Sequence, residues 1–112
     1  MKRNYLGEFE EIVLLFVAVQ HDKAYGFSIT KSIEEELNRS VTMSSVHTAL
    51  YRLQEKGYVS SRLGENSTER GGRRKRLFTI TTQGKAALRK AREVRNYLWQ
   101  KMPNNLMEGG LI

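Results

Sequence analysis

The sequence contains no cysteine, which excludes disulfide bonds and thiolate metal ligands and fits a reducing compartment. His21 and His47 are its only histidines, and neither has a partner at metal-ligand spacing. No carboxylate lies in a recognisable catalytic or metal motif, and the acidic cluster 34–36 reads as a solvated helix face. We therefore expect no enzymatic activity, no cofactor and no metal.

No apolar run reaches the length needed to cross a membrane, and the first residues lead into an acidic segment rather than a signal-peptide core. These absences favour a cytoplasmic protein. The 112 residues suffice for one domain with a modest hydrophobic core, to which a second subunit would add.

The positive charge lies in the second half of the chain. Residues 1–57 carry seven Lys or Arg against eight Asp or Glu, whereas residues 58–112 carry twelve against four, so the net charges are −1 and +8. Such asymmetry is typical of proteins that bind nucleic acid or an anionic surface.

The hydrophobic periodicity predicts four helices. The first is apolar almost all round, which implies burial on more than one side. The second carries the stripe Ile29, Ile33 and Leu37, and Val41 after it is a candidate for a single β-bridge. The expected helices are 6–20, 27–38, from an N-cap at Thr42 or Ser44 to about Lys56, and from a cap at Thr82 to about Met102.

Between the third and fourth helices, residues 58–63 and 76–80 are rich in β-forming side chains and predict a hairpin. The loop between these strands carries cations around a glycine pair, which lets the backbone bend against a surface. The cationic loop indicates contact with a polyanion. Its expected contact residues are Arg70, Gly71, Gly72, Arg73, Arg74 and Lys75.

The third predicted helix has two distinct faces. Its inward stripe is Val46, Ala49, Leu50 and Leu53, and Gly57 ends the helix. Short polar side chains at the start of the opposite face can approach base edges and phosphates, and a helix N-terminus offers free amide donors. The outward residues expected to contact DNA are Ser44, Ser45, His47, Thr48, Tyr51 and Arg52, with Lys31 of the preceding helix near phosphate.

The last predicted helix has an apolar stripe that recurs every three or four residues, as in a helix–helix seam. We expect it to pair with a second copy of the chain, helped by the first helix, and we expect a loose tail over 104–112. The expected interface residues are Phe9, Ile12, Phe16, Leu88, Ala91, Val94, Leu98 and Trp99.

The order of elements, three helices, a two-stranded wing and a helix, predicts an α+β, mainly α, winged helix-turn-helix fold with a C-terminal dimerisation helix. Residues 6–11, 24–26, 50–59 and 69–81 resemble the PadR-like transcriptional regulators, and the likeness extends over about residues 6–102. Its most specific part is the Gly-Gly-Arg-Arg-Lys wing followed by an aromatic residue, Ile80 and Thr81. The winged domain would span 1–81 and the dimerisation helix 82–103, in the same compact unit.

The resemblance implies a homodimer that binds palindromic double-stranded DNA as a repressor, relieved by a small molecule or a stress signal. Family members commonly carry Tyr where this chain has His47, whose imidazole can still form hydrogen bonds to base edges or phosphate. Trp99 is either an anchor in the dimer seam or a platform for a flat aromatic effector. Two alternative functions stay open: a basic module that binds RNA or an anionic surface, and an interaction protein that keeps the winged fold.

Overall fold

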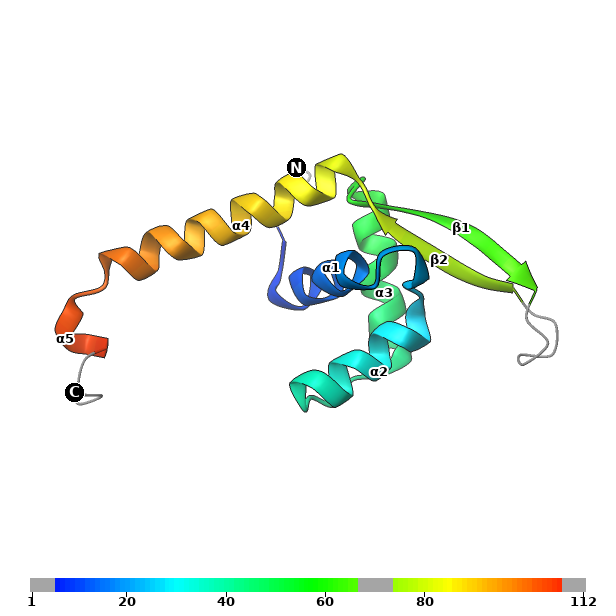
Figure 1. Cartoon of the computed structure of the whole chain (residues 1–112), viewed down its shortest axis with the longest axis horizontal. Coiled ribbons are helices and arrows are strands. Elements are labelled where there is room, and N and C mark those ends of the chain that lie inside the picture. The colour runs from blue at the N-terminus through cyan, green and yellow to red at the C-terminus, as the bar shows by residue number, and fades with distance from the viewer. Residues whose placement is uncertain (1–5, 67–73, 108–112) are drawn as a thin grey trace.

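The structure is a computed structural model that describes residues 6–66 and 74–107. Three helices gather beside a β-hairpin, and a long helix leads away on the side opposite the hairpin tip (Figure 1). The elements are α1 (Glu8–Gln20), the 3-10 turn η1 (His21–Lys23), α2 (Gly26–Leu37), α3 (Met43–Glu55), β1 (Val59–Asn66), β2 (Arg74–Ile80), α4 (Thr82–Lys101) and α5 (Asn104–Met107).

Apolar side chains from α1, α2, α3 and β2 meet in one core. The predicted inward stripe of α3 is confirmed, since its four apolar residues are all buried. Phe78 of β2 closes the core from the hairpin side. The largest fully buried side chains are Phe78, Leu14, Ile29, Ile33, Leu50 and Leu53.

Local hydrogen bonds fix the helix boundaries. The Thr42 side chain accepts from the backbone N–H of Ser45 at 3.0 Å and so caps α3. The predicted cap of α4 is wrong by one residue, because Thr81 rather than Thr82 accepts from the N–H of Gly84, at 3.0 Å. As predicted, α3 ends before Gly57, whose φ of +81° is strained for other residues.

The two strands are antiparallel, and their register decides which side chains share a face. Ser61 lies opposite Phe78 and Leu63 opposite Arg76, with a bulge between Leu63 and Asn66. Directly paired residues point to the same side of a sheet and alternate residues point to the same side along a strand. Phe78 and Arg76 therefore lie on one face of the hairpin, whereas Lys75 and Leu77 lie on the other. Both strands continue further into the predicted loop than expected, to Asn66 and from Arg74.

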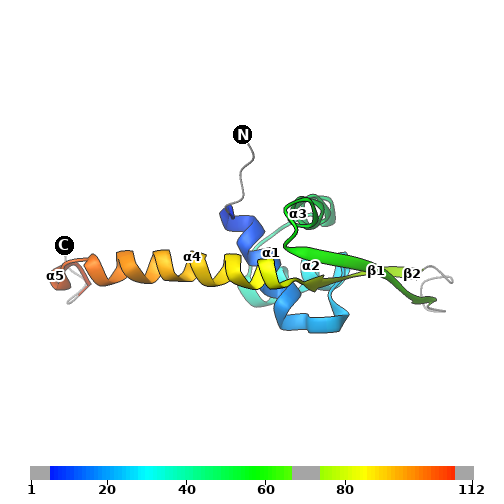
Figure 2. The same cartoon turned by 90° about the horizontal axis from the view of Figure 1, so that it is seen from above.

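The start of α4 is pressed against the body of the protein. A Cβ atom at Gly84 would overlap the backbone carbonyl oxygen of Tyr58, so this approach requires glycine. Ala87 and Leu88 pack against the core, and beyond them α4 extends away from the other helices (Figure 2). The principal-axis extents of 57 × 33 × 23 Å reflect this projection.

Three further predictions are corrected. Val41 forms no bridge; the isolated bridge joins Ala24 to Phe78, whose N–H donates to the Ala24 carbonyl at 2.8 Å. Leu37, expected in the buried stripe of α2, is 45% exposed because it is the last residue of that helix. The predicted loose tail contains the short helix α5, which follows Pro103.

Candidate nucleic-acid interface

The outward face of α3 is open to solvent. All six side chains predicted to contact DNA from this helix are exposed, and they lie opposite its buried stripe. No acidic residue lies in its first turn. The face therefore combines a positive helix end with short polar groups, an arrangement that suits an anionic ligand. These residues are Ser44, Ser45, His47, Thr48, Tyr51 and Arg52.

Two hydroxyl groups on this face donate their protons to the helix backbone. Ser45 Oγ donates to the Thr42 carbonyl at 2.8 Å, and Thr48 Oγ1 donates to the Ser44 carbonyl at 3.0 Å. Their oxygen lone pairs therefore point outward. In this rotamer they can accept hydrogen bonds from the amino groups that adenine and cytosine expose in the major groove.

His47 and Tyr51 are set in place by packing. A Cβ atom at Gly26 of α2 would overlap the imidazole of His47, so the ring lies directly against the start of α2. The His47 and Tyr51 rings meet edge to face with centroids 6.3 Å apart, and Tyr51 meets Phe78 of β2 at 6.1 Å. These contacts connect α2, α3 and the hairpin, and they position the His47 and Tyr51 side chains at the exposed surface.

On the face of the hairpin shared with Phe78, Arg76 Nη1 donates to Ser61 Oγ at 3.1 Å. The Ser61 hydroxyl in turn lies 3.2 Å from Gln54 Oε1 of α3, to which it donates. Arg76 therefore points toward α3. It was absent from the predicted contact residues, although its alternation with Phe78 would have placed it on this face.

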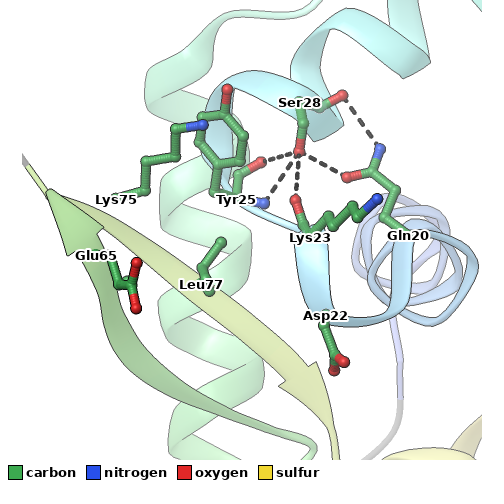
Figure 3. A pocket seen from close by; sticks show the side chains of 9 residues that line it. Gln20, Asp22, Lys23, Tyr25, Ser28, Glu65, Lys75 and Leu77 are labelled. Carbon is green, nitrogen blue, oxygen red and sulfur yellow. Dashed lines mark hydrogen bonds between the residues drawn. The ribbon is translucent and has the colours of Figure 1, made fainter. Parts of the chain in front are cut away.

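The other face of the hairpin lines a cavity of about 590 Å³ beside the start of α2 (Figure 3). Lys75 Nζ lies 4.5 Å from the centroid of the Tyr25 ring, a cation–π contact. Lys75 is half-buried, whereas Arg74 is exposed and donates through Nε to the Gly64 carbonyl at 2.7 Å. The two described cations predicted to contact DNA from the wing thus lie in different surroundings.

Of the remaining residues predicted to contact DNA, Lys31 lies within the described part of the chain. Lys31 is exposed on α2 and pairs with Glu35 one turn later, at 3.4 Å. Such a pair is weak and leaves the ammonium accessible. The loop residues Arg70, Gly71, Gly72 and Arg73 lie outside the described residues.

The outer part of α4 exposes apolar side chains. Val94 is 50% exposed, and Leu98 and Trp99 are each 57% exposed, as no element of the described chain covers them. Phe9, Ile12, Leu88 and Ala91 are partly buried nearer the body. The expectation for Phe16 is corrected: it is only 8% exposed and packs in the core of the chain itself, so its side chain is not available to a second copy.

The first turn of α1 holds three carboxylates, each paired with a cation from a different part of the chain. Glu8 receives two hydrogen bonds from Arg39, at 2.9 and 3.2 Å. This contact lowers the pKa of Glu8 and raises that of Arg39, whose guanidinium also lies over the Phe9 ring. The other pairs are Glu10 with Lys56, at 2.5 Å, and Glu11 with Arg95 of α4, at 2.6 Å.

Trp99 lies at the rim of a groove of about 780 Å³ between α1, β2 and α4. Leu15 and Leu88 form apolar walls, and Arg89 and Arg92 bring positive charge. Among residues 6–66 and 74–107, no cluster of His, Asp or Glu could hold a metal ion, and no helix is long and apolar enough to cross a membrane.

The sequence matches the model of the transcriptional regulator PadR-like family over residues 14–90. The chain belongs to the PadR-like family of transcriptional regulators. The match covers α2, α3, the hairpin and the first half of α4, as well as most of α1. A search of curated proteins found no match.

Solved structures share the PadR-like fold. A PadR-like transcriptional regulator from Bacillus cereus is 21% identical with a TM-score of 0.70, over 90% of this chain and 92% of that chain. A PadR family regulator from Clostridium difficile is 22% identical with a TM-score of 0.66, over 88% and 98%. Bacillus subtilis PadR in complex with operator DNA is 23% identical with a TM-score of 0.62, over 86% of this chain and 49% of that one. The predicted winged helix-turn-helix fold, α+β and mainly helical, is confirmed.

Proposed function

We propose that this PadR-like regulator is a cytoplasmic homodimer that represses transcription by binding a palindromic DNA operator. Residues 1–81 would bind DNA, and 82–103 would join the two copies. The observation that carries the proposal is the exposed polar face of α3 beside a cationic hairpin. The operator complex of the Bacillus subtilis relative supports it.

In this proposal α3 enters the major groove and presents Ser45, His47 and Thr48 to base edges, with Ser44 and Tyr51 beside them. Arg52 and Lys31 lie near phosphates. The wing holds the flanking backbone through Arg74 and through the loop cations Arg70 and Arg73, with Gly71 and Gly72 allowing close approach.

The dimer would form along α4. The apolar side chains that α4 exposes are costly in water and become covered when two copies pair. Val94, Leu98 and Trp99 would lie at the centre of this interface, with Leu88, Ala91, Phe9 and Ile12 closer to the body.

The first experiment selects binding sites from a pool of random duplexes and then measures competition. A palindromic site should be recovered, and random duplex or RNA of equal length should compete poorly for the protein. Equal competition by RNA or by any polyanion would favour the basic-module alternative. No binding to any duplex, with an intact dimer, would favour an interaction protein.

The base-reading assignment is tested by Thr48→Ala and Ser45→Ala on the recovered site. A direct contact should relax preference at one base pair by about 1–3 kcal/mol. Thr82→Ala changes an exposed threonine of α4 and serves as the matched control. An equal loss of affinity for operator and random duplex would refute the assignment.

The groove beside Trp99 supports a second proposal, that it holds a flat aromatic effector. Trp99 is the only tryptophan, so tryptophan fluorescence reports the surroundings of this one side chain. Small aromatic compounds should quench the emission and weaken operator binding. No quenching would leave Trp99 as an anchor of the dimer seam, and quenching without an effect on DNA affinity would show binding without an effector role.

A further inference from the structure

We propose that Lys75 anchors the wing to Tyr25 instead of binding a DNA phosphate, and that Tyr25 is therefore a positioning residue for the wing. The inference rests on the proposed DNA-binding function and changes one of its expected contacts. Lys75 Nζ lies 4.5 Å from the centroid of the Tyr25 ring (Figure 3).

Tyr25 is a firm support for this anchor. Its backbone N–H donates to Ser28 Oγ at 3.0 Å, and the Ser28 hydroxyl lies 2.6 Å from Gln20 Oε1 of α1. The neighbouring Ala24 carbonyl accepts from Phe78 of β2. On the other side, Gly26 lies against His47 of α3. The backbone that carries the Tyr25 ring is thus held by contacts with α1, α2, α3 and β2.

The charges around the ring favour an ammonium and oppose a phosphate. Asp22 and Glu65 line the same cavity as Tyr25 and Lys75. Figure 3 shows the Lys23 side chain extending toward Gln20, away from the Tyr25 ring. A phosphate that entered this cavity would share it with these two carboxylates, which favour a cation there.

The two faces of the hairpin then have separate roles. On the face away from Phe78, Lys75 connects the hairpin to Tyr25. On the other face, Arg76 connects it to α3 through Ser61 and Gln54. A hairpin held on both faces keeps a fixed direction, so Arg74 at its described end would reach the same place on each duplex.

The anchor can be tested first in the free protein. Lys75 Nζ lies over the Tyr25 ring, so the ring current should move the NMR signals of the adjacent Hε protons upfield. Tyr25→Phe keeps a ring and should keep the shift, whereas Tyr25→Leu should abolish it. Ordinary lysine shifts in the unaltered protein would overturn the proposal. So would loss of the upfield shift on addition of duplex DNA.

The second test measures how DNA affinity depends on salt. Removing a phosphate contact lowers the slope of log K against log salt by about 0.9. Arg74→Met should show this loss. Lys75→Met should weaken binding roughly two- to fivefold, the range expected of a cation–π contact, at an unchanged slope.

Tyr25→Leu should equal Lys75→Met in effect, and the double variant should be no weaker than either single variant. A lowered slope in Lys75→Met, or additive losses in the double variant, would overturn the proposal. The slope can be measured on any duplex, so this result is independent of whether a preferred operator exists.

Discussion

Lys56, directly after α3, places its Nζ 2.5 Å from Oε1 of Glu10 in the first turn of α1. Both side chains are largely removed from water, with 17% and 15% of their surfaces exposed. A partly buried pair of this kind holds the end of α3 against α1, because either charge is poorly solvated without the other.

Glu10→Gln should therefore lower the free energy of unfolding by roughly 1–3 kcal/mol, as a partly buried ammonium loses its charged partner. Chemical denaturation monitored by circular dichroism measures this loss. Glu35→Gln is the matched control, because its pair with Lys31 is 64% and 57% exposed and should contribute about 0.5 kcal/mol or less. Equal effects of the two substitutions would contradict the assigned role of Glu10.

The Glu8–Arg39 pair should make stability depend on pH. The hydrogen bonds from Arg39 lower the pKa of Glu8 below its ordinary value of 4.5. The folded state therefore prefers the ionised carboxylate, and the stabilisation is present above pH 4.5 and lost as the pH falls through the lowered pKa. The Tm difference between the unaltered protein and Glu8→Gln should shrink on acidification. A difference that stays constant through this range would refute the assignment.

Leu98→Asp should produce monomers and reduce operator affinity. Leu98 is 57% exposed in the protomer, so the substitution leaves the core intact, but it would bury a charge in the proposed seam. Sedimentation or light scattering measures the change in mass. Gln100→Asp adds the same charge at a neighbouring exposed position of α4 and serves as control. If Leu98→Asp remains a stable dimer, the α4 interface is wrong.

Gly26→Ala and Gly84→Ala should both lower stability, by different amounts. At Gly26 the added methyl meets the tip of the exposed His47 side chain, which can rotate away, so stability should fall by about 1 kcal/mol or less while DNA preference changes. At Gly84 it meets the backbone of Tyr58, which cannot move aside, and the loss should be about 2 kcal/mol or more. Thermal denaturation separates the two cases. Replacing His47 by Ala as well should relieve only the Gly26 variant.

Much of the fold follows from the sequence because periodicity and capping residues act locally. The structure confirms the buried stripe of α3, the end of the helix before Gly57 and one of the two predicted caps, Thr42. Each of these features depends on residues only a few positions apart. The sequence did not reveal that Phe78 bridges Ala24, because a single bridge between distant residues leaves no periodic signal.

The candidate surface was less accessible to sequence reasoning. Exposure of the polar face of α3 could be predicted from its opposite stripe. Strand alternation alone places Lys75 and Arg76 on opposite faces, but the contact of Lys75 with Tyr25, fifty residues earlier, could not be predicted from a run of consecutive cations. The packing of Phe16 into the core was missed for a similar reason: an all-round apolar helix does not show which side its own domain covers.

The length of α4 has a geometric consequence for the proposed dimer. A straight helix fixes the distance and the rotation between its two ends. In the proposed dimer, α4 would therefore set the distance and the relative orientation of the two copies of α3. Seven residues added to its middle would lengthen it by about 10.5 Å and turn it by nearly two whole revolutions. Each half would then keep almost the same orientation while the distance between them changed by roughly three base pairs of duplex for each such insertion.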